Sequence, residues 1–359
     1  MLQEAIEHEP AEFSVQEARR IVQDLFEPSP AIYWTDLLLA ATVGFTCFAL
    51  LRTQETFSWG WIAIYIGAVL ALYRAGLFTH ELVHLRTGTF FSFRVAWNLL
   101  IGIPFLMPSF TYDTHRDHHA RNNYATKDDG EYLPLGAGPP WKILWYLAQS
   151  FIVSVLPIIR FGLITPLCWI SPRLRTFVQQ RFSSLVMDPT YVRPLPTSKE
   201  LRVWRVLEMC CFLFICYFAT LLLLGIAPWG FLARVYAVGC GVALINEVRT
   251  IGAHRFRFSG DHEVTFLDQL LDSVNFPYHP ISGELWAPVG LRYHALHHLF
   301  PSMPYHNLGK AHRRLMAQLP ADSPYRQTVA TSLPRAILDL WQSAHSSTRV
   351  TTAATSNAT

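Results

Sequence analysis

The chain has 359 residues, of which 51% are hydrophobic and only 15% are charged. Soluble domains carry about 25% charged residues, so this composition argues against a soluble globular protein and favours an integral membrane protein. The net charge of +3 is small and the basic residues are scattered, which excludes nucleic acid as an expected partner.

The first part of the chain is acidic and amphipathic, and it lacks the basic start and apolar stretch of a secretory signal. We expect residues 1–30 to form a cytoplasmic amphipathic segment and residues 31–319 to form one membrane domain. Residues 320–359 are expected to hold a C-terminal helix and then a tail. From Ser346 onward that tail is rich in Ser, Thr and Ala, which predicts disorder.

Four apolar stretches are candidate membrane spans, since a spanning helix takes about 20 residues. They are Ile32–Leu51, Phe57–Phe78, Trp204–Ile226 and Phe231–Ile245. Two further stretches, Phe90–Phe110 and Trp141–Ile170, contain prolines. Because proline breaks helical hydrogen bonding, we expect these two to be interfacial or re-entrant.

Eight of the fifteen histidines fall into three clusters at helical spacing. The first has the form HxxxH and the other two the form HxxHH: His80 and His84; His115, His118 and His119; His294, His297 and His298. Residues three and four apart share a helix face, so each cluster presents its imidazoles to one point. Eight imidazoles exceed what one tetrahedral zinc ion needs and predict a site for two metal ions. Outside the clusters, His312 is expected to be an ordinary surface residue.

The three clusters resemble the boxes of the membrane fatty acid desaturase superfamily, of the bacterial three-histidine-box type. The runs Glu247–Phe256 and Pro288–Leu308 strengthen the resemblance, which covers roughly residues 51–319. It implies an all-α integral membrane protein with about four transmembrane helices, interfacial helices and a cytoplasmic histidine-rich metal-binding cap. It also implies a di-iron centre in which His254 is a ninth ligand. Some relatives have a metal-linked asparagine four residues earlier, where this chain has Thr250, so that role is not transferred.

A shared metal site constrains the topology, because its histidines must lie on one face of the membrane. The chain must then cross an even number of times between His84 and His115, and again between His119 and His254. The two proline-containing stretches should therefore not cross. Seven Lys and Arg residues lie in Ser171–Arg205. By the positive-inside rule, the histidines should face the cytoplasm in a multi-pass inner-membrane protein.

Nine neutral imidazoles around two divalent ions leave a charge of about +4 for nearby groups to balance. Glu81, Asp113 and Asp117 lie inside or beside the clusters, and we predict that these carboxylates orient the imidazoles. Asp268 and Asp272, four residues apart on an expected helix, are secondary candidates.

The resemblance implies an O2-dependent acyl-lipid desaturase that introduces a double bond into a long hydrocarbon chain. Two iron ions and O2 are the implied cofactor and co-substrate, and a lipid or acyl chain is the implied substrate. Electrons must come from an external donor, since the chain has no CxxC iron–sulfur pattern and no HPGG motif of a fused cytochrome. We expect a separate ferredoxin, rubredoxin or cytochrome.

Two alternatives remain open. The same ligands would serve a hydroxylase or ketolase acting on alkane, sphingolipid-like or carotenoid substrates, because the position of the substrate decides between an alkene and an alcohol. The protein could instead be a membrane metal transporter or metal-binding protein, although the histidines of transporters usually lie near the bilayer midplane.

Overall fold

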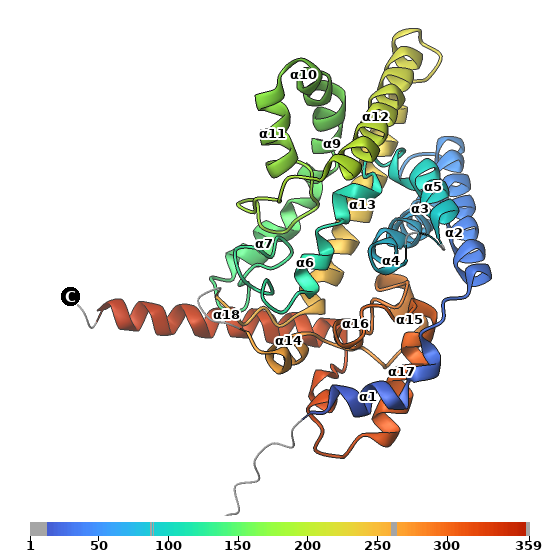
Figure 1. Cartoon of the computed structure of the whole chain (residues 1–359). Coiled ribbons are helices and arrows are strands. Elements are labelled where there is room, and N and C mark those ends of the chain that lie inside the picture. Colours follow the sequence, from blue (N-terminus) through green and yellow to red (C-terminus); the bar gives the residue numbers. More distant parts are fainter. Residues whose placement is uncertain (1–12, 87, 89, 260–263, 357–359) are drawn as a thin grey trace, which may run out of the picture.

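The computed structural model describes residues 13–86, 88, 90–259 and 264–356, with side chains up to residue 348. Within these residues the chain is helical, and β structure is limited to isolated bridges such as the one between His254 and Ser273. Long helices make up one part of the molecule, and shorter helices gather with α18 (Leu333–Ser356) at one end of it (Figure 1). The predicted all-α membrane fold is confirmed.

Four helical segments are long and apolar enough to cross a membrane. They are α2 (Pro30–Leu50), α3 with α4 (Trp59–Gly76 and Phe78–His84), α12 (Ser198–Leu223) and α13 (Gly230–Ala253). They match the four predicted spans, and the second and fourth extend further than predicted, to His84 and Ala253. The apolar run of α13 stops at Ile245, yet its helix continues to Ala253, and the polar side chains of Glu247 and Arg249 in this last part are buried within the protein.

Local sequence explains where the long helices begin and how they pack. Thr197 and Glu200 form a capping box at the start of α12, which satisfies free backbone N–H groups there. A Cβ atom at Gly44 would lie 2.6 Å from the Leu72 side chain, and one at Gly241 would lie 2.5 Å from the Tyr65 hydroxyl. Glycine therefore allows α2 and α13 to approach α3 closely.

The two proline-containing stretches are broken helices. The first consists of α5 (Phe91–Trp97) and a π-helical turn, after which the side-chain oxygen of Asn98 accepts a hydrogen bond from the Ser109 backbone (2.9 Å). The second contains α7 (Trp141–Ala148), α8 (Ser150–Val153), α9 (Leu156–Ile158) and α10 (Thr165–Ile170). Its two halves are bent by 47°, as in a broken span or a re-entrant loop. The structure brings the histidines of all three clusters together, and the prediction that this stretch returns to its own side of the membrane or forms a tight pair stays a prediction.

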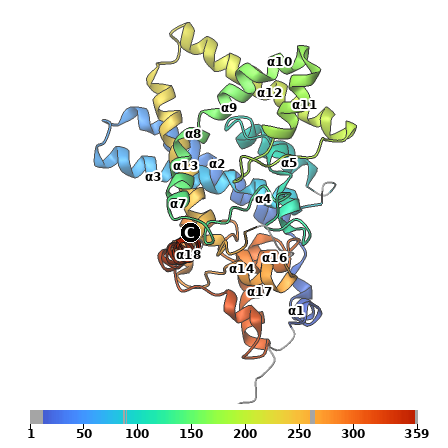
Figure 2. The same ribbon diagram turned by 90° about the vertical axis from the view of Figure 1, so that its left-hand side faces the viewer.

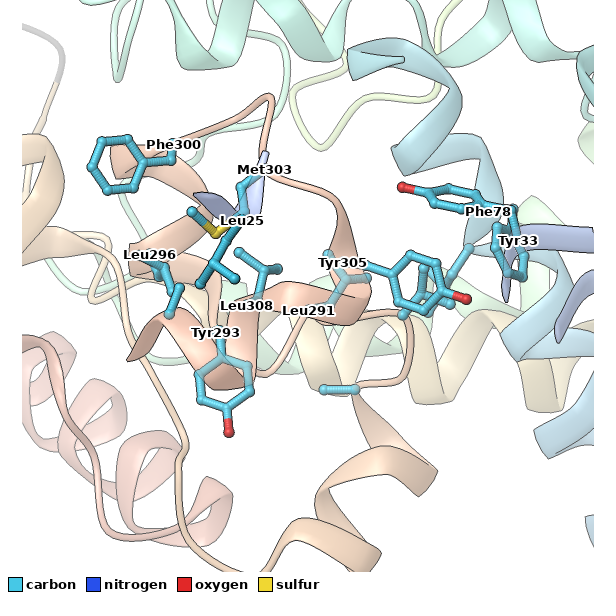
Figure 3. Packing of buried hydrophobic residues seen from close by; sticks show 14 of the residues in the cluster. Leu25, Tyr33, Phe78, Leu291, Tyr293, Leu296, Phe300, Met303, Tyr305 and Leu308 are labelled. Carbon is cyan, nitrogen blue, oxygen red and sulfur yellow. The ribbon is translucent and has the colours of Figure 1, made fainter. Parts of the chain in front are cut away.

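The remaining helices surround the histidines or connect the spans. They are α1 (Val15–Ile21), α6 (His115–His119), α11 (Pro172–Arg181), α14 (Phe266–Asp272), α15 (Pro280–Trp286), α16 (His294–Leu299) and α17 (Tyr305–Gln318). Figure 2 shows α14, α16 and α17 grouped on one side of α4. An aromatic cluster fixes this group to the spans, since the Tyr305 ring lies 5.0 Å from Tyr33 of α2 and 5.7 Å from Phe78 of α4 (Figure 3).

The structure describes the C-terminal end of the chain further than the N-terminal end. Residues 1–12 of the predicted N-terminal segment lie outside the described residues. At the other end, α18 continues through Ser346 to Ser356, where the composition predicts a disordered tail. Leu340 and Ala344 of this helix are buried in a cluster with Tyr124 and Phe256, so α18 packs on the membrane domain.

Candidate metal centre

Nine histidines form two groups, and within each group the potential ligand nitrogens all lie within 4.8 Å of one another. The first group is His80, His84, His115, His119 and His297, and the second is His118, His254, His294 and His298. These are the nine positions that the sequence singled out. The groups are neighbours, because the ring centroids of His119 and His298 lie 4.3 Å apart.

Each HxxHH cluster is divided between the two groups. His115 and His119 belong to the first group while His118 belongs to the second, and the third cluster is divided the opposite way. Sequence analysis expected all three imidazoles of a cluster to meet at one point. Residues i+3 and i+4 lie about 100° apart around a helix, so the middle histidine diverges and reaches the other group.

Short helices and one helix end position these side chains. The first cluster closes α4, at the end of a membrane span, and the other two form the short helices α6 and α16. All six residues of α16 are buried. His254 caps the C-terminal end of α13 in an extended conformation, which turns its ring away from the helix.

The distances between Nε2 atoms fit ligands that share a metal ion. In the first group, His119 lies 3.0 Å from both His115 and His297. In the second, His294 lies 2.8 Å from His254 and 3.1 Å from His298. Two nitrogens bound to one ion at about 2.1 Å and at a right angle lie about 3.0 Å apart.

Several buried imidazole nitrogens have no hydrogen-bond partner among the described residues. They are both ring nitrogens of His80, Nε2 of His84, and Nδ1 of His119, His294 and His297. An unsatisfied buried polar atom costs about 1–3 kcal/mol. A metal ion would satisfy the nitrogens of His80 and His84 that face the first group, whereas His119, His294 and His297 already turn Nε2 toward the other ligands. The donor set therefore fits two metal ions, as the resemblance implies.

Two carboxylates contact Nδ1 atoms of the second cluster. Nδ1 of His118 contacts both oxygens of Asp129, at 2.9 and 3.1 Å, and Nδ1 of His115 lies 2.8 Å from Glu131. With Nδ1–H donating to a carboxylate, Nε2 is left free to bind a metal ion. Both carboxylates follow the cluster in an irregular loop, where no periodic pattern in the sequence could indicate them.

A hydroxyl and a carboxylate hold His254 in a similar way. The Tyr124 hydroxyl lies 2.9 Å from Nδ1 of His254 and donates to Asp272 at 2.8 Å. Since a hydroxyl has one proton, it accepts from Nδ1–H of His254 while it donates to Asp272. Asp272, a secondary candidate from the sequence, therefore acts on His254 through Tyr124, which sequence reasoning missed.

None of the three carboxylates predicted to orient the imidazoles makes a hydrogen bond to a histidine among the described residues. Glu81 accepts hydrogen bonds from the Tyr33 hydroxyl and from the Tyr305 backbone (3.3 Å), and its other oxygen lies 4.0 Å from Nδ1 of His80. Asp113 and Asp117 make no hydrogen bond to a histidine within the described part of the chain. They neighbour the clusters in sequence, but their side chains leave the helix in other directions.

The protonation of the histidines suits metal binding. Burial and the neighbouring imidazoles hold the pKa of His119, His294, His297 and His298 well below the ordinary value. These rings are therefore neutral at pH 7 and keep a free lone pair. Burial also lowers the pKa of His118, but the charge and hydrogen bond of Asp129 outweigh it and raise the pKa above the ordinary value.

The chain was compared with protein families and with known proteins. The family model described as fatty acid desaturase matches residues 56–329, a range that contains all nine histidines. The chain is 37% identical over 328 residues to a ceramide hydroxylase from Caulobacter vibrioides (strain NA1000 / CB15N). This alignment covers 91% of the present chain and 93% of the relative. No solved structure matches.

Proposed function

Because the chain belongs to the fatty acid desaturase family, we propose that it is an O2-dependent di-iron hydroxylase acting on a ceramide-like lipid. The relative, a ceramide hydroxylase, carries this choice, since it supports the hydroxylase alternative over the desaturase expected first from the sequence. Introduction of a double bond remains the second outcome that an experiment must distinguish.

We propose that the nine histidines hold two iron ions, which would supply the O2 chemistry needed to oxidise an unactivated C–H bond. The protein orients the ligands: Asp129 and Glu131 accept from His118 and His115, and Tyr124 accepts from His254. We retain Glu81, Asp113 and Asp117 only as nearby carboxylates, because no hydrogen bond to a histidine supports a closer role.

The overall reaction requires a reductant. Conversion of C–H to C–OH incorporates one atom of O2, and the other leaves as water after uptake of two electrons and two protons. We propose that a separate ferredoxin, rubredoxin or cytochrome delivers the electrons. The six cysteines form no CxxC pair, which supports an external donor.

We further propose that both metal groups lie at the cytoplasmic face of the inner membrane. The basic residues of Ser171–Arg205 support this orientation through the positive-inside rule. His80 and His84 close the span Trp59–His84, and His254 follows the span that ends at Ala253. This location at span ends does not favour the metal-transporter alternative, which places ligands near the midplane.

Lipid analysis tests the proposal. The wild-type chain and His118→Ala would be expressed in a bacterial host supplied with ceramide, and extracted lipids compared by mass spectrometry. We expect a ceramide one oxygen atom heavier with the wild type, and no such product with the variant. A product two hydrogen atoms lighter would assign a desaturase instead.

A further inference from the structure

A buried arginine lies beside the metal centre without a counter-ion. Arg249 is on α13, five residues before His254, and only 7% of its surface is exposed. Its Nε atom has no hydrogen-bond partner among the described residues, and the side chain forms no ion pair with a carboxylate there. The nearest acidic residue in sequence, Glu247, lies about 200° around the helix and faces elsewhere.

Two neighbours on the same helix hold the guanidinium in place. Nη2 donates to the side-chain oxygen of Asn246 at 3.1 Å and to the Thr250 hydroxyl at 3.0 Å. The Thr250 hydroxyl in turn donates to the Asn246 backbone carbonyl at 2.8 Å. Thr250 occupies the position at which some relatives have an asparagine, and in this chain it fixes a cation instead.

Arg249 lies on the helix that leads into the second histidine group. The helix that carries Arg249 ends at Ala253, directly before His254 of the second group. Five helical residues rise by about 7.5 Å, which sets the distance of Arg249 from His254 along the helix axis.

A buried guanidinium with an unsatisfied N–H group destabilises the folded protein unless another group pairs with it. A buried charge without a partner destabilises a protein, and two metal ions nearby would add repulsion. The Asn246 and Thr250 contacts are to neutral oxygens and leave Nε without an acceptor. An acceptor oxygen of a bound molecule would satisfy this Nε–H group.

We propose that Arg249 binds the amide carbonyl or a hydroxyl oxygen of a ceramide-like substrate, and so places the carbon to be oxidised within a few bonds of the lipid's polar part. This rests on the proposed function and deepens it by naming the residue that recognises the polar group. A chain held in this way presents its polar end to the metal centre, whereas a purely apolar substrate gains nothing from the guanidinium.

Lipid binding can be measured separately from catalysis with zinc-loaded protein, because zinc occupies histidine sites but does not change oxidation state. The protein would be placed in nanodiscs, and quenching of tryptophan fluorescence titrated with a brominated ceramide and with a brominated alkane of matched length. Arg249→Met removes the charge, and Arg249→Lys keeps it without the planar fork. Arg234→Met is the matched control, since Arg234 lies near the opposite end of α13.

We expect Arg249→Met to weaken ceramide binding at least tenfold, equivalent to about 1.4 kcal/mol, and alkane binding less than twofold. Arg249→Lys should fall between, and Arg234→Met should match the wild type. Unchanged ceramide binding would overturn the proposal, as would equal weakening of both lipids or loss of zinc. Because the zinc protein does not turn over, a failure to hydroxylate ceramide would contradict the proposed function without affecting this result.

Discussion

Nδ1 of His118 lies 2.9 Å from Oδ2 of Asp129, a carboxylate with a fully buried side chain, and Nε2 of the same ring lies 3.2 Å from Nε2 of His254. The backbone N–H groups of Ala125 and Glu131 also donate to Asp129, so the carboxylate is fixed before any metal binds. This pair determines which nitrogen of His118 faces the second histidine group.

Replacing Asp129 should therefore weaken metal binding. Asp129→Asn keeps the size of the side chain but removes its charge, and loss of such an outer partner typically lowers metal affinity about 10–100-fold. Competition with a chelator of known affinity measures the effect. Asp128→Asn is the control, because the neighbouring side chain is exposed. Equal affinities in both variants would show that Asp129 does not act on the metal centre.

The two groups predict a metal count. His254→Ala removes one of four nitrogens from the second group and leaves the first group intact. We expect the metal content of purified protein to fall from about two ions per chain toward one. Elemental analysis gives the count, with the exposed His279→Asn as the control. Two ions retained in His254→Ala would argue against His254 as a ligand.

Much of this site is predictable because its ligands follow helical spacing. The sequence could predict that the three clusters come together, and hydropathy predicted the four long apolar helices, whereas the prediction from parity that Trp141–Ile170 does not cross stays a prediction. The carboxylates were not predictable in this way. Asp129 and Glu131 reach the second cluster through a loop, and Asp272 is linked to His254 by hydrogen bonds through Tyr124, so their contacts depend on tertiary structure.

The position of Glu81 gives a different prediction. Its Oε2 joins Tyr33 of α2 to the Tyr305 backbone of α17, so it stabilises the packing of three helices. Glu81→Gln should lower the free energy of unfolding by about 1–3 kcal/mol while the metal content stays the same. Thermal unfolding in detergent and elemental analysis measure the two quantities. Loss of metal at unchanged stability would show instead that Glu81 supports the metal centre.

His312 gives a prediction about pH. The sequence placed it at the surface, but it is buried on α17, and Nδ1 lies 2.7 Å from the Tyr325 hydroxyl. Burial, followed by nearby Arg292 and Arg313, lowers its pKa to about 4. The unfolded chain binds a proton below about pH 6.5, whereas the folded chain does not until about pH 4, so stability falls between these values as the pH is lowered.

At pH 5 the protonation of His312 in the unfolded chain destabilises the folded state by about 2 kcal/mol relative to neutral pH. His312→Asn keeps a polar group near Tyr325 but does not titrate. The change in unfolding midpoint between pH 7.5 and pH 5, measured for both proteins, isolates the contribution of His312 from that of the other histidines. We expect a smaller change in the variant, and an identical change would contradict the buried, neutral state of His312.

The central claim is that this chain uses O2 and two histidine-bound metal ions to hydroxylate a ceramide-like lipid. The most direct test supplies the iron-loaded, purified protein with ceramide, a reduced ferredoxin and oxygen gas labelled with the heavy isotope, followed by mass spectrometry of the lipid. We predict one heavy oxygen atom in the product of the wild type and none with His118→Ala. A ceramide that gains no label, or that loses two hydrogen atoms instead, would contradict the account.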